Sequence, residues 1–283
     1  MSTILDDIDA RPGSTTSLLR TIIGLYLRRI GGWIAISDLV ELMEDLGTPA
    51  ARTRTGVVRL KKKELLIAER EEAIGYRLNP DSVRMLERGD RRIFDVKQMH
   101  VGDAWCLVSF SIPEEQRDLR HQVRRRLQWI GCGMVQPALW LCPDYLQPEV
   151  NEILIELGAR VYSVLFRTEE PKVAYSLPTA IPYWWDLGEL RAQHTAFQEA
   201  VAEIENREIE TDRDAFVAYL SLIDNWRILP YVDPGLPAHL LPADWPGQRS
   251  IDSYRELSAR LHERAWAHVQ SVVDRADAAQ ARR

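Results

Sequence analysis

Apolar positions recur at helical spacing in the first third of the chain, and they predict a helix over residues 16–30. The pair Gly31-Gly32 ends this helix, because glycine readily adopts the left-handed backbone found at helix ends. A second helix is predicted over residues 37–47, with the hydroxyl of Ser37 as its N-cap. These two helices would supply apolar faces on which a third helix can pack.

The third predicted helix opens at Thr48-Pro49, with a threonine N-cap and proline at the first helical position. On an ideal helical wheel Thr53, Val57 and Leu60 share one face, which would pack on the first two helices. The opposite face carries, at i, i+3, i+7 and i+10, the residues Arg52, Thr55, Arg59 and Lys62. The cations are therefore sorted outward at the helical period, which favours a surface for a polyanion.

A short strand-turn-strand pattern follows the third helix. The segments 65–70 and 76–80 flank a turn over residues 71–75 that carries a glycine. This order of helices and hairpin is how a winged helix-turn-helix presents its recognition helix and wing. A further polar helix over residues 81–94 completes a predicted DNA-binding domain, residues 16–94.

The pattern changes in the middle of the chain, where short apolar strands alternate with two helices. Residues 105–112 predict a strand, and residues 113–131 predict a charged helix opened by proline and ended by glycine. Two short strands, a helix over 149–158 and a last strand over 159–167 follow. Strand-helix-strand-strand-helix-strand is the split βαβ order, so we expect a ferredoxin-like central domain over residues 104–170.

From Tyr183 onward the pattern is mainly helical. One apolar stripe is formed by Leu190, Phe197, Val201 and Ile204. A proline-rich turn over 230–247 precedes a final amphipathic helix over 253–273, and the tail after it is expected to fray. We expect a helical C-terminal domain over residues 183–275, a disordered leader over residues 1–15, and an α+β multidomain fold.

Charge is distributed unevenly along the chain. Residues 1–92 carry 16 Lys and Arg against 14 Asp and Glu, a net of +2, whereas the remainder carries 20 against 28, a net of −8. Residues 52–63 alone hold six cations and no acid, in a protein of formal net charge −6. The N-terminal part can therefore approach nucleic acid, while most of the rest would be repelled from it.

The sequence favours a cytoplasmic location. Cys106, Cys132 and Cys142 are spaced unlike metal ligands, and they predict reduced, buried thiols. No stretch approaches the roughly 18–20 apolar residues of a membrane span. The N-terminus is acidic and polar, unlike a signal peptide.

The sequence contains no recognised catalytic motif. His262-Glu263 begins like a zinc-protease motif, but the next histidine comes six residues after His262 rather than four. Phosphate-binding loops, a G-x-G-x-x-G turn and a nucleophile elbow are missing from the sequence. We therefore expect no enzymatic activity, no cofactor and no metal site.

The C-terminal run of tryptophans, prolines and glycines resembles the PaaX family of phenylacetate-degradation repressors. The matching residues are Trp226-Arg227-Ile228-Leu229-Pro230-Tyr231-Val232-Asp233-Pro234-Gly235-Leu236-Pro237, Leu240-Leu241-Pro242 and Trp245-Pro246-Gly247. Further similar residues are Trp185-Asp186-Leu187, Arg54-Thr55 and Arg59-Leu60. The chain departs from the family at Gly56 and Val58, where small residues are usual, and at Glu64, where glycine is usual.

The resemblance implies a winged helix-turn-helix, a ferredoxin-like middle domain and a helical C-terminal domain. It also implies a dimeric repressor that leaves its operator when an aryl-CoA thioester, typically phenylacetyl-CoA, binds. The middle domain in turn resembles the small ferredoxin-like CRISPR-associated endonuclease, which carries a catalytic aspartate at the end of its first strand. Here that strand ends Phe110-Ser111-Ile112-Pro113, with no acid before Glu114, so we expect the middle domain to be structural.

The third helix and the hairpin supply the candidate DNA contacts. Arg52 and Thr55 are the predicted base readers, and Val58 would touch a thymine methyl group. The other cations would contact phosphates. The full predicted set is Arg52, Arg54, Thr55, Val58, Arg59, Lys61, Lys62, Lys63, Arg70 and Arg77. The alternative is that some of these side chains are simply solvated.

An acyl-CoA effector would need an aromatic slot and cations for its phosphates. The candidate residues are Arg124, Trp184, Trp185, Trp226, Arg227, Tyr231 and Trp245. The alternative is that the Trp-Pro-rich turns lock a corner between helices. The basic face formed by Arg117, Arg120 and Arg124 is either solvated or a contact for a second subunit, DNA or CoA phosphates.

Together these observations predict a repressor of an aromatic-acid catabolic operon that binds palindromic double-stranded DNA as a homodimer. An acyl-CoA effector would release it from the operator. The alternative is a winged-helix architectural or protein-interaction module without a small-molecule effector.

Overall fold

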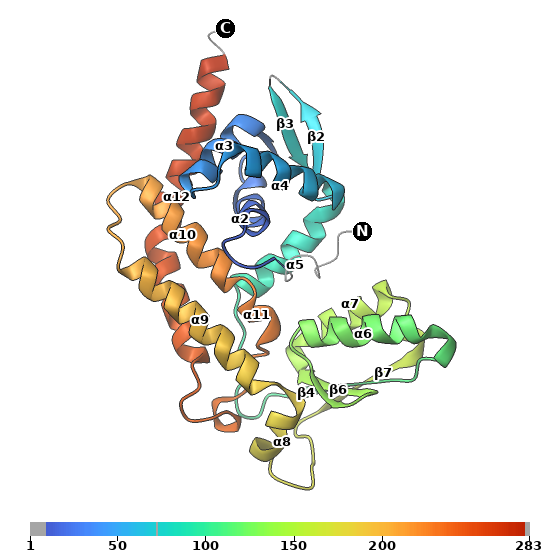
Figure 1. Cartoon of the computed structure of the whole chain (residues 1–283). Helices are drawn as coiled ribbons and strands as arrows, with labels where there is room; N and C mark the ends of the chain where they lie inside the picture. Colours follow the sequence, from blue (N-terminus) through green and yellow to red (C-terminus); the bar gives the residue numbers. More distant parts are fainter. Residues whose placement is uncertain (1–9, 72, 281–283) are drawn as a thin grey trace. The chain divides into compact units, whose positions relative to one another are not determined.

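The structure is a computed structural model that describes residues 10–71 and 73–280 (Figure 1). These residues form helices and two antiparallel sheets, so the fold is α+β as expected. The chain divides into two compact units. Unit 1 comprises Met1–Phe94, Phe197–Arg227 and Ser250–Arg283, and unit 2 comprises Asp95–Ala196 and Ile228–Arg249.

Two predicted boundaries can be placed against these units. The predicted leader falls mainly on residues 1–9, which lie outside the described residues. The segment 183–275, predicted as one helical domain, is distributed over both units. The domain boundaries themselves stay a prediction.

The N-terminal part of unit 1 alternates helices with short strands. Its elements are α2 (Thr15–Ile22), the π-helix η1 (Ile23–Leu27), β1 (Trp33–Ala35), α3 (Ile36–Asp45), α4 (Ala50–Lys62), β2 (Leu66–Arg70), β3 (Ile74–Leu78), the 3-10 turn η2 (Pro80–Ser82) and α5 (Val83–Ile93). Three long helices belong to unit 1 wholly or in part: α9 (Leu187–Glu205), α10 (Asp212–Trp226) and α12 (Gly247–Gln280).

The first predicted helix is confirmed, but its second half is a π-helix, η1. The predicted glycine stop is also present, since Gly31 and Gly32 have φ of +88° and +86°. The two predicted N-caps are wrong. The chain leaves β1 extended and enters α3 from Ala35, so Ser37 lies inside the helix and its hydroxyl donates to Asp38 Oδ1 at 3.0 Å.

Helix α4 begins one residue later than predicted. Pro49 is the N-cap, with no side-chain hydrogen bond, and Thr48 is buried. The predicted inward face is confirmed, since Thr53, Val57 and Leu60 are fully buried. The helix therefore presents its remaining face outward, as the wheel predicted.

The hairpin that follows α4 joins β1 in a three-stranded antiparallel sheet with the order β1-β3-β2. The prediction of a glycine in the turn is wrong, because Gly75 lies within β3, paired with Ala35 and Glu69. A Cβ atom on Gly75 would lie 2.4 Å from a ring carbon of Trp33. The glycine is therefore needed for close packing under the Trp33 ring.

Unit 1 also contains a buried carboxylate, Asp224 of α10, which is 0% exposed. Its Oδ1 accepts hydrogen bonds from Ser17 Oγ at 2.6 Å and Thr21 Oγ1 at 2.7 Å, both on α2. Its Oδ2 accepts from the Gly13 amide at 2.7 Å. Arg227 Nε lies 3.3 Å from Oδ1. These bonds attach α2 to α10 across more than 200 residues of sequence.

Unit 2 is built around the second sheet. Its elements are β4 (Trp105–Phe110), η3 (Glu114–Gln116), α6 (Arg117–Trp129), β5 (Gly133–Gln136), β6 (Leu139–Pro143), η4 (Asp144–Leu146), α7 (Gln147–Glu156), η5 (Arg160–Tyr162), β7 (Ser163–Thr168), α8 (Leu177–Trp184), α11 (Leu229–Val232) and η6 (Ala238–Leu240). The predicted succession of two helices and four strands in the middle of the chain is present.

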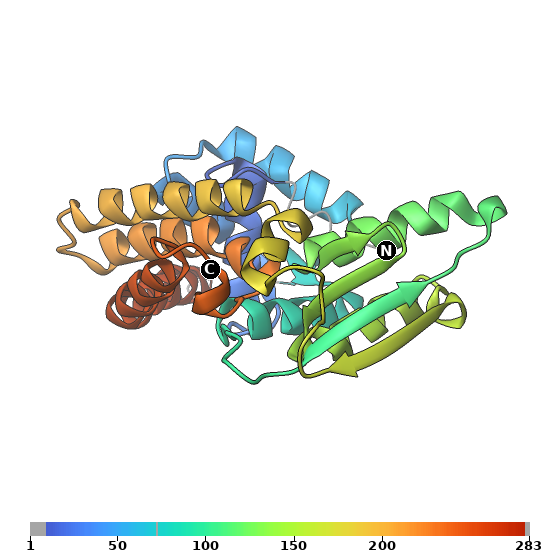
Figure 2. The ribbon, with the colours of Figure 1, turned by 90° about the horizontal axis from the view of Figure 1, so that it is seen from below.

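The four strands pair antiparallel in the order β5-β6-β4-β7, seen from a second direction in Figure 2. Helices α6 and α7 lie together on one side of this sheet (Figure 1) and pack on alternate residues such as Cys106, Val108 and Phe110. The other face packs, through Trp105 and Leu141, on residues of α8, α9 and η6.

The C-terminal helices differ from the prediction mainly in extent. The stripe of Leu190, Phe197, Val201 and Ile204 is buried, as predicted. No helix was predicted at α8. Helix α12 is longer at both ends than residues 253–273, and it continues through Gln280, into the tail that was expected to fray.

The three cysteines are free and buried, as predicted. Cys106 and Cys142 lie opposite each other on β4 and β6, and a hydrogen bond to Cys142 together with burial raises the pKa of the Cys106 thiol far above its ordinary value. Within residues 10–71 and 73–280, none of the helices has the length and apolar character to span a membrane. The same residues contain no group of three or more His, Cys, Asp or Glu that could hold a metal ion.

Glu64 has φ of +59°, the one positive φ among the described non-glycine residues. We expect Glu64→Gly to be more stable than Glu64→Ala by about 1 kcal/mol, because a Cβ atom disfavours the left-handed backbone. Both variants remove the carboxylate, so their difference isolates the backbone cost. Urea denaturation measures it, and equal midpoints with equal slopes would contradict the prediction.

Replacing Asp224 by alanine is expected to lower the free energy of unfolding by about 3–5 kcal/mol, because the buried hydrogen-bond donors around Asp224 lose the carboxylate that accepts from them. The matched control is Asp214→Ala in the same helix, where the exposed carboxylate accepts from the Thr211 hydroxyl at 2.7 Å. Urea denaturation compares the two. A loss for Asp224→Ala no larger than that for Asp214→Ala would contradict the prediction.

Candidate nucleic-acid interface

The outward face of α4 is strongly cationic. Arg52, Arg54, Arg59, Lys61 and Lys62 are all exposed, and Lys63 at the C-cap is half-buried. Helix α4 itself contains no acidic residue. The exposed face of α4 therefore carries several cations, and the helix itself has no acidic residue that could neutralise them.

Two uncharged residues of the predicted DNA-binding set lie among these cations. Val58 is 45% exposed, so its methyl groups are available for contact with the methyl group of a base. Thr55 is also exposed, and its hydroxyl donates to the carbonyl oxygen of Ala51 at 3.0 Å. Since its hydrogen is engaged, the Thr55 hydroxyl is left to act as an acceptor toward a base.

A recess of about 360 Å³ runs along this face. Its lining residues are Thr15, Ala51, Arg52, Thr55, Gly56 and Arg59. Thr15, Ala51 and Gly56 were not among the predicted site residues. The missing side chain of Gly56 in a helical segment was the signal that could have indicated a close approach.

Gly56 lets α2 and α4 approach closely. A Cβ atom at this position would lie 2.5 Å from Leu19 Cδ1 and 3.2 Å from Thr15 Cγ2. Such distances require the neighbour to move. The departure from the family at Gly56 therefore has a packing cause within this chain.

The two arginines of the predicted wing differ in their surroundings. Arg70, at the end of β2, is exposed. Arg77, on β3, forms ion pairs with Glu69 and Glu71 within the same hairpin. Arg77 would have to leave these carboxylates to contact a phosphate, so Arg70 is the better placed of the two.

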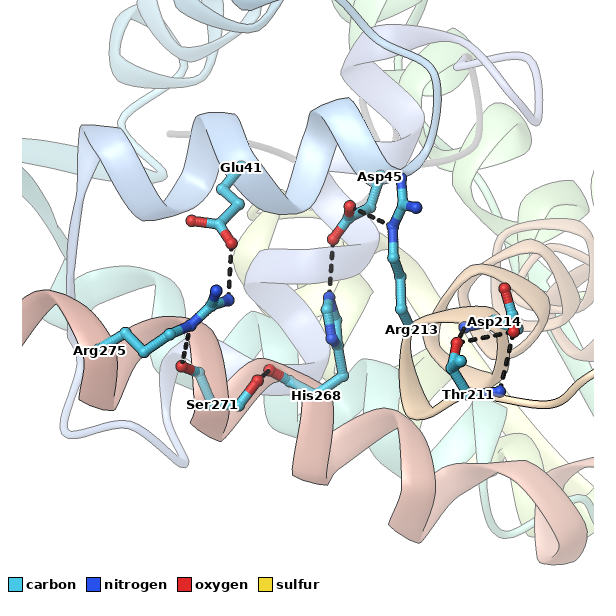
Figure 3. A network of polar contacts seen from close by, with 8 residues as sticks. All are labelled: Glu41, Asp45, Thr211, Arg213, Asp214, His268, Ser271 and Arg275. Carbon is cyan, nitrogen blue, oxygen red and sulfur yellow. Dashed lines mark hydrogen bonds and ion pairs between the residues drawn. The ribbon is translucent and has the colours of Figure 1, made fainter.

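Helix α3 is attached to the C-terminal helices of unit 1 by ion pairs that we call the α3 clasp (Figure 3). Asp45 lies 2.7 Å from His268 Nε2 and 2.6 Å from Arg213 Nε. Glu41 lies 2.7 Å from Arg275 Nη2. Since α4 packs on α3, the clasp contributes to positioning α4.

The candidate effector residues are not brought together in one compact unit. Trp226 and Arg227 belong to unit 1, whereas Arg124, Trp184, Trp185, Tyr231 and Trp245 belong to unit 2. Trp226 is buried, donates from Nε1 to the Ile93 carbonyl at 3.0 Å and stacks on Tyr254. Arg227 lies in the Asp224 network.

The unit 2 candidates mostly support packing. Trp185 is buried and donates from Nε1 to the carbonyl oxygen of Gly131 at 2.8 Å. Trp245 is half-buried, and its ring lies edge-on to His194. Arg124 donates to the Pro137 carbonyl at 3.0 Å. These contacts are those of residues that hold turns and helices in place.

Sequence models of one family match three successive parts of the chain. They are described as PaaX-like protein (residues 14–81), PaaX protein central Cas2-like domain (residues 98–178) and PaaX-like protein C-terminal domain (residues 185–271). The chain belongs to the PaaX family.

Individual relatives agree with this assignment. The transcriptional repressor PaaX of Escherichia coli (strain K12) is 28% identical over 268 residues, which cover 91% of this chain and 82% of that protein. Among solved structures, uncharacterized protein Rv0674 from Mycobacterium tuberculosis is similar with a TM-score of 0.57 and 20% identity. That match covers 91% of this chain and 99% of the other, and it shows a shared fold.

Gly56→Ala is expected to lower the free energy of unfolding by about 1–3 kcal/mol through overpacking against Leu19. Within a helix alanine is otherwise about 1 kcal/mol more favourable than glycine. A loss of stability therefore has to come from the close approach of α2 and α4 at this position. The control is the double variant Leu19→Ala with Gly56→Ala, in which the two costs should not add. Additive losses in urea denaturation would contradict this explanation.

Proposed function

We propose that this protein is a transcriptional repressor that binds operator DNA through the exposed face of α4. The observation that carries the proposal is the sorting of α4, with its apolar residues buried and its cations exposed. A DNA backbone is a regular array of negative charge, and such a face is complementary to it. The Escherichia coli relative named as a transcriptional repressor supports the same function.

We propose further that residues 16–94 form a winged helix-turn-helix domain. Helices α2, α3 and α4 are followed by the β2–β3 hairpin, which pairs with β1 between α2 and α3. In this arrangement α4 is the recognition helix and its N-terminal half faces base edges. Arg52 and Thr55 are then the base readers, and the cations from Arg59 to Lys63 contact phosphates.

The fold of the central segment is proposed to be ferredoxin-like. The strand order β5-β6-β4-β7, with α6 and α7 on one face, agrees with the split βαβ arrangement. Strand β4 ends at Phe110, and the next acid, Glu114, is held by Arg120 at 2.6 Å. This hydrogen bond lowers the pKa of Glu114. An acid engaged in this way supports a structural role for the segment and a non-enzymatic protein.

The remaining elements of the proposal rest on family membership. They are a cytoplasmic homodimer on a palindromic operator, an aromatic-acid catabolic operon as its target, and release by an aryl-CoA such as phenylacetyl-CoA. The uneven charge of the chain supports a single DNA-facing surface, since the acidic remainder would be repelled by DNA.

Footprinting of the protein on its own upstream region, at two salt concentrations, tests the proposed function. We expect Arg52→Ala to cost about 1–3 kcal/mol of binding and to relax specificity at one base position. Lys62→Ala should weaken binding at all sequences alike and reduce the salt slope by about one. Arg260→Ala, at an exposed position on α12, is the control and should change neither.

The two variants discriminate between the possible outcomes. Equal, sequence-blind losses for Arg52→Ala and Lys62→Ala would show that α4 contacts DNA without reading bases. Absence of any footprint would favour the architectural or protein-interaction alternative.

A further inference from the structure

The β2–β3 hairpin has two faces of different chemistry. Directly opposite residues of an antiparallel pair point to the same face, and the face alternates along each strand. Arg70 lies opposite Ile74, and Ile67 lies opposite Arg77, so these two pairs project from opposite faces. The Ile74 face consists of Leu66, Ala68, Arg70, Ile74, Tyr76 and Leu78, and the Arg77 face consists of Ile67, Glu69, Gly75 and Arg77.

The Arg77 face carries more acid than base. Arg77 forms ion pairs with Glu69 and with Glu71, which follows β2 directly. One guanidinium and two carboxylates give this cluster a net charge of −1. The ring of Trp33 lies against Gly75 on the same face. A polyanion would therefore be repelled from the Arg77 face.

The Ile74 face is buried at its base and exposed toward the tip of the hairpin. Leu66 and Leu78 are 1% and 5% exposed, whereas Ile74 is 62% exposed although it is aliphatic. Arg70 is also exposed. None of the residues of this face is acidic. Its outer part therefore combines a cation with an apolar side chain.

Arg70 and Ile74 act as one surface feature. Directly opposite Cβ atoms of an antiparallel pair lie about 4.5–5.5 Å apart, so the two side chains project together. Within the described part of the chain Arg70 has no carboxylate partner, in contrast to Arg77 with its two ion pairs. The charge of Arg70 is thus available to a partner outside the chain.

The hairpin begins close to the end of α4 (Figure 1). Only residues 63–65 separate Lys62, the last residue of α4, from the start of β2. The amide of Leu65 donates to the carbonyl oxygen of Leu60 at 3.1 Å, which attaches the start of the hairpin to the helix. A hairpin attached so closely reaches DNA beside the groove that α4 occupies, and the neighbour of a major groove is a minor groove.

We propose that the Ile74 face enters the minor groove next to the major groove occupied by α4, a step that rests on the proposed function. The guanidinium of Arg70 lies in the groove, and Ile74 packs against the sugars of its wall. The minor groove is narrow and strongly negative in A·T-rich DNA, and arginine is attracted to it there. Guanine places its N2 amino group in this groove. The hairpin therefore favours A·T over G·C at the positions it contacts.

The acidic residues of the hairpin agree with this orientation. The carboxylates of Glu69 and Glu71 meet the side chain of Arg77, so they belong to the face that is turned away from the groove. On the Ile74 face the same carboxylates would meet phosphates. The pairing with Arg77 thus lets a hairpin rich in glutamate approach DNA from one side.

Gel shifts with the full-length protein and three versions of the segment it protects in footprinting test this contact. The versions carry A·T, G·C or inosine·cytosine pairs in blocks of three at each edge of the segment. An inosine·cytosine pair presents the major groove of G·C but has no N2 amino group in the minor groove. In at least one block we expect A·T and inosine·cytosine to bind alike and G·C to bind at least about fivefold more weakly.

Variants assign this preference to one face of the hairpin. Arg70→Ala should bind the three versions of that block with equal affinity. Ile74→Ala should weaken binding of all three at least about threefold, through loss of the contact with the groove wall. The matched control is Ile67→Ala, because Ile67 is 45% exposed on the Arg77 face and should stay within about twofold of the parent. The thermal midpoint of each variant checks that the protein stays folded.

The outcomes separate this proposal from the proposed function. If inosine·cytosine binds as weakly as G·C in every block, or if Arg70→Ala keeps the preference of the parent, minor-groove reading by Arg70 is refuted while DNA binding through α4 stands. Equal losses for Ile74→Ala and Ile67→Ala would overturn the assignment of the Ile74 face. A parent protein that protects no DNA segment overturns the proposed function and this inference with it.

Discussion

The buried carboxylate of Asp224 is the interaction on which the arrangement of unit 1 depends. A charge removed from water is costly unless hydrogen-bond donors surround it, so the side chains that meet Asp224 have to be in place together. Those donors include Ser17 and Thr21 of α2, and α2 is one of the helices on which α4 packs. The placement of the cationic helix is therefore tied to a residue more than 150 positions further along the chain.

The α3 clasp holds α3, the second helix on which α4 packs, in a similar way, through charged side chains that pair with residues far along the chain. Asp45 and Glu41 of α3 meet partners on α10 and α12, while Tyr26 in η1 stacks on Trp266 of α12. Both helices beneath α4 are thus held by C-terminal helices of the same compact unit. This explains in physical terms why residues 197–227 and 250–283 group with the N-terminal segment rather than with their neighbours in sequence. Any ligand or contact that displaces α10 or α12 acts on the support of α4.

Periodicity predicted the helices and strands well, because a helix or strand that is buried on one side needs apolar residues at a regular spacing. This spacing is directly visible in the sequence. The inward residues Thr53, Val57 and Leu60, and the stripe from Leu190 to Ile204, were found in this way. Features that depend on distant partners could not be found. Gly75 was placed in a turn because the ring of Trp33 that requires it comes from another strand. The hydrogen bond of Trp226 to Ile93 and its stacking on Tyr254 were likewise not visible in the sequence, and its role in an effector site stays a prediction. Ser37 and Thr48 have the right chemistry for N-caps, but the chain enters each helix one or two residues away from them.

The positions at which this chain departs from its family are of two kinds. Some are determined by packing and backbone conformation within the unit, and another lies on the exposed face of α4. Gly56 is set by contact with Leu19 inside the unit, and Glu64 occupies a backbone conformation that glycine adopts at lower cost, held by hydrogen bonds from Asn79 and Ser82 to its carbonyl oxygen. Neither position faces outward from the helix as a base reader. Val58 does, and together with Arg52 and Thr55 it lies on the exposed face of the helix. A change of operator within such a family is therefore expected to appear at these outward positions. The residue type at the inward positions depends instead on how closely α2 and α4 approach each other.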